Sequence, residues 1–581
     1  MVLYYIRALS MAYFLKKSNY KKGTYLQIYE SFYDPDRGYS AHKSYKAIGY
    51  VNDLIADGIE DPIAYYQSEV DDLNRKRKQG LSEAKYKQIS EETPERFLGY
   101  FPLKAINDSL GAKKFVDLMQ TATDYKFNVY ELMSALIYSR ATLPCSKSRT
   151  YDEVIPRLYT NYNLSLPQIY SGLAYIGSEY EKIIEIYNVQ VQAKYGHDTK
   201  HTYFDCTNFY FEIDREDDFR KKGPSKERRL EPLVGMGLLL DANLIPMGMK
   251  IYPGNESEKP KLREVINSLK ERNNIKGRTI QVADKGLNSA PNIIETLKQK
   301  DGYIFSKSVK MLAAIEKDWI FLPQDYVDVK DSNGNILYRY KECIDDFPYD
   351  LIDSKGKKKT VLLKEKRVVT YNPTLAKKQQ YEIHKLIEKA NDLTVSKAKK
   401  SEYGECSKYV SFQAADKRGK KKEEDVVIAE INQDKINEDL ALAGYNLLVT
   451  SETNMSASEL YSTYHNLWRI EESFRIMKSQ LDARPVYLQK EDTITGHFLI
   501  CYLCVLLLRL LQFKKLDNKY CSEDIFSFIK NFRVVEVSEN KYINITRATD
   551  FIKDFAKDTS LPLMSYYLSK GQISGMLSYR F

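Results

Sequence analysis

Three acidic residues, Asp205, Asp284 and Glu471, lie in sequence contexts that predict a chemical role. Asp205 interrupts a β-like run and Asp284 ends a short one; aspartate is depleted in strands, and an acid at the carboxyl end of a strand is a usual place for a site. Carboxylates that converge repel one another unless they share cations. Oxygen-only ligation suits Mg²⁺ or Mn²⁺, and two such ions can hold the attacking and leaving oxygens of a phosphoryl displacement. The acids therefore predict metal-dependent phosphodiester chemistry on nucleic acid.

The segment that carries Glu471 has the composition of a helix. It contains neither Gly nor Pro from 456 to 484, which predicts one continuous helix. Tyr464, Leu467, Glu471 and Lys478 fall at i, i+3, i+7 and i+14, so they share one side of that helix. A buried or half-buried Glu471 would need a cation or a metal as partner. The alternative is an ordinary surface helix with a Glu–Lys pair.

The elements around these acids predict an α/β core. Predicted strands lie at 202–212, 233–241, 244–255, 278–286, 302–306 and 444–450, and predicted helices at 259–273 and 290–299. The first three strands read as an antiparallel meander. The order is three strands, a helix, a strand with Asp284, an insertion, a strand and a helix with Glu471, and it resembles the ribonuclease-H-like order.

The whole chain divides into six predicted parts. These are a basic, aromatic β-rich unit (1–57), a helical DNA-binding or linking domain (58–195), a first core part (196–309), an inserted β-containing lobe (310–440), a second core part (441–515) and a helical tail (516–581). In the first part, two alternating runs flank the turn Asp34–Gly38. Such a surface suits contact with a DNA backbone, and a plain hairpin with a solvated lysine face is an equal alternative.

Composition limits the function classes. Lys and Arg number 88 against 79 acids, a net charge of +9, which permits a polyanionic partner without requiring one. Seven scattered cysteines favour a reducing, cytoplasmic setting. The apolar run Phe498–Phe513 is short for a membrane span and contains Arg509, so we expect a buried core helix and no membrane partner. Neither a GxxxxGK[ST] loop nor a GxSxG elbow supports an ATPase or hydrolase.

A zinc site is not predicted. His197, His201 and Cys206 are close in sequence, but no matching Cys/His pair completes four ligands with the usual spacing.

The residues Tyr464, Glu471 and Lys478 resemble the Tyr-x2-Arg-x3-Glu-x6-Lys signature of a large group of DDE insertion-sequence transposases. The stretches 204–208, 225–229, 253–255 and 283–286 also look like that group. The signature arginine is replaced by Leu467. Arg469 or Arg475 are the candidates to take over its phosphate contact.

The resemblance implies the roles of individual residues. Asp205, Asp284 and Glu471 would bind Mg²⁺ or Mn²⁺, and Tyr464 and Lys478 would hold the DNA strand near the cleaved bond. Three residues on the loop after the first strand would flank the DNA, with a solvated hairpin tip as the equal alternative, and a fourth lies beyond the signature segment: Lys226, Arg228, Arg229 and Arg484.

The function implied by the resemblance is that of a transposase acting on double-stranded DNA, both transposon ends and target. It would work as a homodimer on DNA in the bacterial cytoplasm, associated with the nucleoid. Two alternatives remain: a DNA-binding protein derived from a transposase that has lost catalysis, and another ribonuclease-H-like nuclease such as a resolvase.

Overall fold

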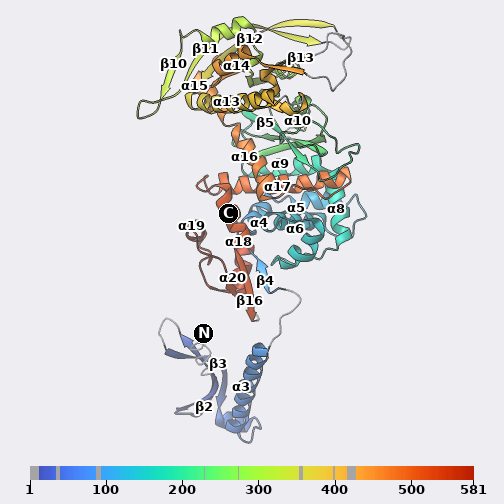
Figure 1. Ribbon diagram of the computed structural model, residues 1–581. Helices are drawn as coiled ribbons and strands as arrows, with labels where there is room; N and C mark the ends of the chain where they lie inside the picture. Colours follow the sequence, from blue (N-terminus) through green and yellow to red (C-terminus); the bar gives the residue numbers. More distant parts are fainter. Residues whose placement is uncertain are drawn as a thin grey trace. The chain divides into compact units, whose positions relative to one another are not determined.

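The computed structural model describes residues 12–34, 39–86, 93–227, 229–272, 274–352, 357–396, 400–414, 427–538 and 540–581 (Figure 1). The chain forms two compact units, Met1–Thr93 and Pro94–Phe581. The predicted turn residues 35–38, the lysine run at 417–422 and Arg228 lie outside the described residues.

The first unit is a three-stranded antiparallel sheet with helices. Its elements are β1 (Tyr13–Tyr20), β2 (Gly23–Asp34), β3 (Tyr39–Tyr50), α2 (Val51–Ala56) and α3 (Pro62–Tyr86). The predicted alternating runs are β2 and β3, whereas β1 was not predicted. The Asn74 side chain on α3 accepts from the Tyr13 amide and donates to the Tyr13 carbonyl, both at 2.9 Å. Helix α3 thus belongs to this unit, although the sequence placed a boundary after residue 57.

The second unit is built around a mixed sheet. Within the described residues this sheet has nine strands in the order β10-β11-β12-β15-β9-β8-β5-β6-β7. The central strands are β5 (His201–Tyr210), β6 (Leu233–Leu240), β7 (Pro246–Pro253), β8 (Ile280–Ala283) and β9 (Gly302–Lys307). Strands β5, β6 and β7 pair antiparallel, and β8 runs parallel to both β5 and β9. The predicted meander and the strands that follow it are therefore confirmed.

Helices connect and cover these strands. Helix α10 (Lys259–Glu271) leads from β7 to β8, and α11 (Ala290–Lys298) leads from β8 to β9. Both helices were predicted. Their apolar residues, among them Leu262, Ile266 and Ile293, join the core cluster on that side of the sheet.

The inserted region continues the core sheet. Strands β10 (Val327–Lys330), β11 (Ile336–Ile352) and β12 (Lys358–Tyr371) add to it, since β12 pairs with β15 (Tyr445–Thr450), which pairs with β9. The remaining described elements of the region are α12 (Ala314–Phe321), α13 (Pro373–Val395), the 3₁₀ segment Lys400–Tyr409, β13 (Val410–Ala414), β14 (Val427–Ile431) and α14 (Gln433–Ala441). A turn at Asp331 connects β10 and β11, where Asp331 Oδ1 accepts from the Asn333 and Asn335 amides at 2.8 Å.

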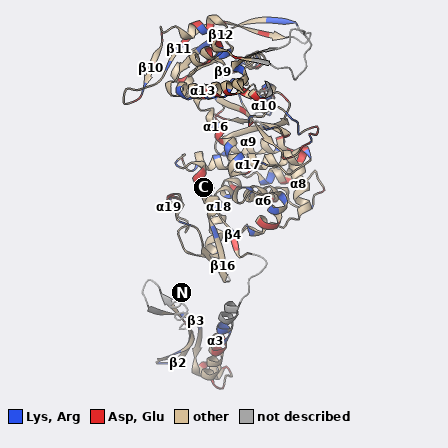
Figure 2. Cartoon of the chain, viewed as in Figure 1, with Lys and Arg blue, Asp and Glu red and all other residues tan. Residues whose placement is uncertain are grey.

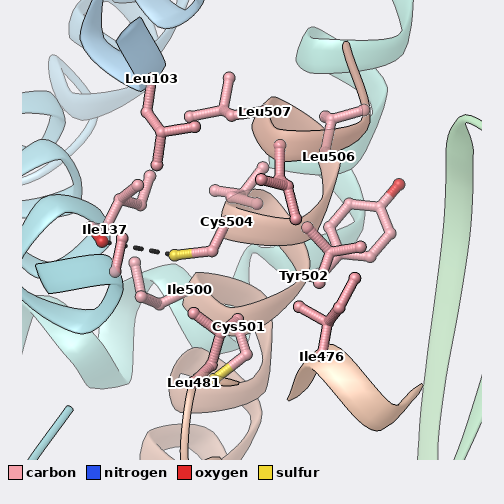
Figure 3. Packing of buried hydrophobic residues seen from close by; sticks show 14 of the residues in the cluster. Leu103, Ile137, Ile476, Leu481, Ile500, Cys501, Tyr502, Cys504, Leu506 and Leu507 are labelled. Carbon is pink, nitrogen blue, oxygen red and sulfur yellow. Dashed lines mark hydrogen bonds between the residues drawn. The ribbon is translucent and has the colours of Figure 1, made fainter. Parts of the chain in front are cut away.

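A layer of helices, which pack against one another, covers part of the sheet. It comprises α4 (Phe101–Leu110), α5 (Lys113–Gln120), α6 (Val129–Thr142), α7 (Lys147–Arg149), α8 (Leu166–Ser178), α9 (Tyr180–Lys194) and α17 (Glu491–Lys514). Helix α17 packs against α4, α6, α8 and β7. Figure 3 shows this packing, with Cys504 on α17 donating to the Ile137 carbonyl at 3.4 Å. The predicted buried helix is confirmed: α17 is long and apolar enough to span a membrane, but its apolar window is fully buried within the protein.

Two glycines allow α8 and α17 to approach closely. A Cβ on Gly177 would lie 1.7 Å from the Asp492 carbonyl oxygen, and one on Gly496 would lie 2.1 Å from the Leu173 carbonyl oxygen. Any side chain at either position would push the two helices apart.

The tail is more mixed than the sequence predicted. It contains α18 (Ser522–Asn531), β16 (Arg533–Ser538), β17 (Lys541–Asn544), α19 (Asp550–Thr559), β18 (Tyr567–Ser569) and α20 (Lys570–Leu577). Its strands form a sheet in the order β18-β17-β16-β4, where β4 is Glu95–Phe97. The prediction of a helical tail missed these strands because they are short and because β16 pairs with β4, more than 400 residues earlier.

Candidate active site

Two of the three acids are neighbours because of strand register. The parallel pair of β5 and β8 ends with Phe204 opposite Ala283. The next residue after each of these two is an aspartate, so Asp205 and Asp284 directly follow the same pair of opposed residues. Tyr203 and Phe204 are buried and fix the strand that carries Asp205.

The third acid comes from a broken helix. The predicted continuous helix is wrong: α15 (Ala457–His465) ends before α16 (Trp468–Arg475), and a π-helical turn follows over Ile476–Gln480. At the junction the amides of Leu467 and Ile470 donate three residues back instead of four. The 3.6-residue spacing is thereby lost. Helix α16 packs against β5, which brings Glu471 toward Asp205.

All three acids line one cavity of about 620 Å³. Four predicted cations line it as well: Lys226, Arg475, Lys478 and Arg484. The carboxylates are therefore not in separate regions of the protein. Among the described residues, however, no group of three His, Cys, Asp or Glu side chains is arranged as a metal site. The three carboxylates are oxygen donors, which fit a hard cation such as Mg²⁺. Cys206 also lines the cavity, but it is buried and packs in the hydrophobic core.

The surroundings of Asp205 raise its pKa above the usual range of an aspartate. Burial raises its pKa to about 6, and the nearby Glu258 and Asp284 carboxylates add to the rise. Two groups oppose it: the Lys226 ammonium, 3.7 Å from Asp205 Oδ1, and the Cys206 amide, which donates to the same oxygen at 2.7 Å. Lys226 also donates to the Cys206 carbonyl. A cation of the chain thus already neutralises the carboxylate that burial disfavours.

Asp284 is held by two hydroxyl groups. Tyr464 and Ser306 both donate to its Oδ1, each at 2.9 Å. Both donors use Oδ1, and neither uses Oδ2. Burial, followed by the charge of Asp284, raises the pKa of Tyr464, so the phenol stays a donor. Tyr464 was predicted to hold DNA; here it positions an acid.

Lys478 and Arg484 share one carboxylate. Lys478 Nζ lies 2.9 Å from Glu227 Oε1 and donates to Thr207 Oγ1 at 2.8 Å. Arg484 pairs with the other oxygen of Glu227. Burial lowers the pKa of Lys478, and Glu227 opposes that shift. The pair of cations at the cavity wall is therefore neutralised in part by an acid of the loop after β5.

The remaining predicted cations differ in position. Arg475 is exposed and lies 3.3 Å from Glu523. Arg469 stacks on the Trp468 ring and pairs with Glu472 at 3.3 Å, and Arg229 lies over the Tyr210 ring; neither lines the cavity. Figure 2 shows Lys and Arg interspersed with Asp and Glu over this unit. Positive charge at the cavity is therefore a local feature.

Leu467, in place of the signature arginine, belongs to the hydrophobic core. It is 9% exposed and packs in the main cluster. Because this position packs in the core, its side chain is not available for a phosphate contact. Of the two candidates to replace the signature arginine, Arg475 lines the cavity.

The sequence left open whether Glu471 is buried, half-buried or part of an ordinary surface helix. Glu471 is exposed, and the buried acid is its neighbour Glu472, paired with the 1%-exposed Arg509 at 3.2 Å. This ion pair was not predicted from the sequence. The signal was available, because Arg509 sits within an apolar helix and a buried arginine needs an acid. His197 likewise has a structural partner, since its Nδ1 lies 2.9 Å from Asp241 Oδ2.

Three carboxylates and four cations therefore line one cavity at a mixed sheet, an arrangement suited to binding metal ions and phosphate groups. The family described as Transposase DDE domain matches residues 196–508, more than half of the chain. The chain belongs to this family of DDE transposases. No curated protein matches it. Membership implies a transposase, with DNA as its partner and divalent metal ions as the family's general cofactor.

Proposed function

We propose that this protein is an insertion-sequence transposase of the Tyr-Arg-Glu-Lys signature group, cutting transposon ends and joining them to target DNA. Asp205, Asp284 and Glu471 are its catalytic acids and the ligands for Mg²⁺ or Mn²⁺. One observation carries the proposal: three carboxylates far apart in sequence line a single cavity together with four cations.

The fold that we propose for the core is ribonuclease-H-like. Its support is the strand order β7-β6-β5-β8-β9, with three antiparallel strands followed by two parallel ones. In this arrangement the first acid lies in the first strand and the second acid follows the fourth. The third acid comes from a helix beyond the inserted region.

The proposed reaction has two displacements at phosphorus. Water attacks the phosphorus at the transposon end, the P–O3′ bond breaks, and the leaving 3′ oxygen takes a proton. The freed 3′ hydroxyl then attacks a phosphodiester of the target, the P–O3′ bond of the target breaks, and the displaced target 3′ oxygen takes the proton that the attacking hydroxyl loses. Bound divalent ions would supply charge neutralisation of the attacking and leaving oxygens. Tyr464 and Ser306 hold one oxygen of Asp284, which orients the carboxylate. The Lys226 ammonium lowers the pKa of the half-buried Asp205 and so favours its ionised form.

The cations of the cavity are proposed to hold the DNA backbone. Lys478, Arg484 and Arg475 line it and would meet phosphates. Lys226, and Arg229 beside Tyr210, would flank the strand on the loop after β5. Cutting two ends together requires two active sites, so we propose a homodimer on DNA. We place it on the bacterial nucleoid in the cytoplasm, with no membrane.

The decisive test is Glu471→Gln. We expect unchanged affinity for DNA, since Glu471 is exposed, and cleavage in Mg²⁺ reduced by about three orders of magnitude or more. The substrate is a supercoiled plasmid carrying the DNA ends that flank the gene. Glu459→Gln, an exposed acid on α15, is the matched control. Cleavage at the parental rate in the Glu471 variant contradicts the catalytic assignment.

Two other outcomes would redirect the proposal. DNA binding by the parental protein without any cutting in Mg²⁺ or Mn²⁺ identifies a transposase-derived binding protein. Cutting without strand joining identifies another ribonuclease-H-like nuclease. Analysis of the products by sequencing gels distinguishes these cases.

A further inference from the structure

A second cavity, of about 690 Å³, lies next to the acid-lined one and is named the basic pocket. Its charged lining residues are Arg140, Lys147, Arg149 and Arg484, against a single acid, Asp482. Arg140 comes from the end of α6 and Lys147 from α7. The proposed reaction does not use these two residues.

Two of these cations are buried without an acid. Arg140 and Lys147 are each 6% exposed. In the described part of the chain their partners are neutral: Arg140 donates to the Cys145 carbonyl at 2.9 Å and to Leu481 at 3.4 Å, and Lys147 lies 3.2 Å from His497 Nδ1. A buried cation ordinarily has an anionic partner.

The contrast within the same unit is direct. Arg509, equally buried, pairs with Glu472 at 3.2 Å. His497 cannot play that part, because a neutral imidazole offers a lone pair and no charge. Its Nε2 lies 3.1 Å from the Ala483 carbonyl, which fixes Nε2 as the donor and Nδ1 as the acceptor for Lys147. Burial, with Arg140 nearby, lowers the pKa of Lys147 to about 7. An anion in the pocket would reverse this shift.

The basic pocket is continuous with the acid-lined cavity, which is the proposed catalytic cavity. Arg484 lines both, and the stretch from Lys478 to Leu488 borders the catalytic cavity at its start and the basic pocket at its end. Tyr170 and Tyr487, 40% and 68% exposed, lie on the pocket lining and offer flat surfaces to sugars or bases. A strand in the first cavity has a charged path into the second.

We propose that the basic pocket binds a backbone phosphate of the DNA strand held in the catalytic cavity, with Arg140 and Lys147 as its donors. The inference rests on the proposed function, because it takes DNA as the ligand. It adds a site outside the acid-lined cavity. Arg140 also holds the backbone at 481 and 482, so an anchored phosphate would couple strand binding to the loop that carries Arg484.

The test is Lys147→Met in the full-length chain. The probe is a fluorescein-labelled 30-base-pair duplex of arbitrary sequence, since phosphate contacts are sequence-independent, titrated by anisotropy at several KCl concentrations without divalent ions. We expect about tenfold weaker binding and a salt slope smaller by about 1. Lys113→Met removes the same charge from exposed helix surface and is expected to change neither.

Stability separates a binding role from a structural one. Replacing a buried ammonium that has no acid partner by an apolar chain should leave the melting temperature equal or higher. Unchanged DNA affinity and slope in a folded Lys147→Met variant overturns the proposal. A second outcome also overturns the proposal: inorganic phosphate alone stabilises the parental protein but not the Lys147→Met variant, while both bind DNA equally well. That result indicates a pocket for free anions.

A measurement on the parental protein covers a variant that does not fold. Duplex DNA should protect Lys147 from acetylation by acetic anhydride, followed by mass spectrometry of its peptide; absence of protection overturns the proposal. Failure of the proposed function has another signature, since no DNA binding by the parental protein defeats both proposals. DNA binding that depends on Lys478 but not on Lys147 defeats only this one.

Discussion

Tyr464 on α15 donates its phenolic proton to Asp284 Oδ1 at 2.9 Å, joining residues 180 positions apart. The same oxygen also accepts a hydrogen bond from the Ser306 hydroxyl. The tyrosine of the signature therefore has a defined partner within the protein. The role of this phenol can therefore be tested separately from any contact with DNA.

Tyr464→Phe should lower the single-turnover cleavage rate by about tenfold or more while DNA affinity stays the same. A hydrogen bond to a charged group contributes roughly 1.5–3 kcal/mol, and the phenyl ring preserves the packing. Tyr461→Phe is the matched control on the same helix, since its ring stacks on Tyr338 away from the acids. An equal loss in binding and cleavage would instead show that Tyr464 contacts the strand directly.

The pH dependence of cleavage should report Asp205. Its pKa of about 6 means that the carboxylate a cation needs is lost as pH falls through 6, so activity at limiting Mg²⁺ should fall there. Lys226 lowers this pKa, so Lys226→Met should move the acid limb to higher pH. The measurement is a pH–rate profile for both proteins. An acid limb that moves down in the variant contradicts the assignment.

Neighbouring glutamates should differ in their effect on stability. Glu472→Gln leaves the buried Arg509 without its counter-charge and should lower the free energy of unfolding by about 3 kcal/mol. Glu471→Gln, one residue away and exposed, should change it by less than about 0.5 kcal/mol. Urea unfolding of the two variants makes the comparison. Equal effects would mean that the ion pair does not stabilise the fold.

Glu227 should restrain DNA binding. Its two oxygens pair with Lys478 and Arg484, so Glu227→Gln frees both cations for phosphates. We expect severalfold tighter binding, on the order of 1 kcal/mol for a partly exposed pair, and a steeper salt dependence. Asp108→Asn, which removes an acid from the surface of α4, is the control. Weaker binding by the Glu227 variant would show that this acid orders the loop for DNA.

The sequence by itself determined the alternating and apolar runs of the core. Local patterns specify the meander of β5 to β7 and the strand before Asp284, because side-chain alternation and burial are properties of single segments. The two aspartates could be singled out for the same reason. The buried character of α17 also followed from composition alone.

Only the tertiary structure decided that Glu471 is exposed and that its neighbour Glu472 is buried against Arg509. It also decided that the helix breaks at the end of α15, where amides donate three residues back, and no periodicity count contains these bonds. The same holds for Tyr464 meeting Asp284, and for β12 pairing with β15 to extend the sheet. Each is a contact between distant segments, fixed by packing and strand register across the whole unit, and a chain read segment by segment carries no record of it.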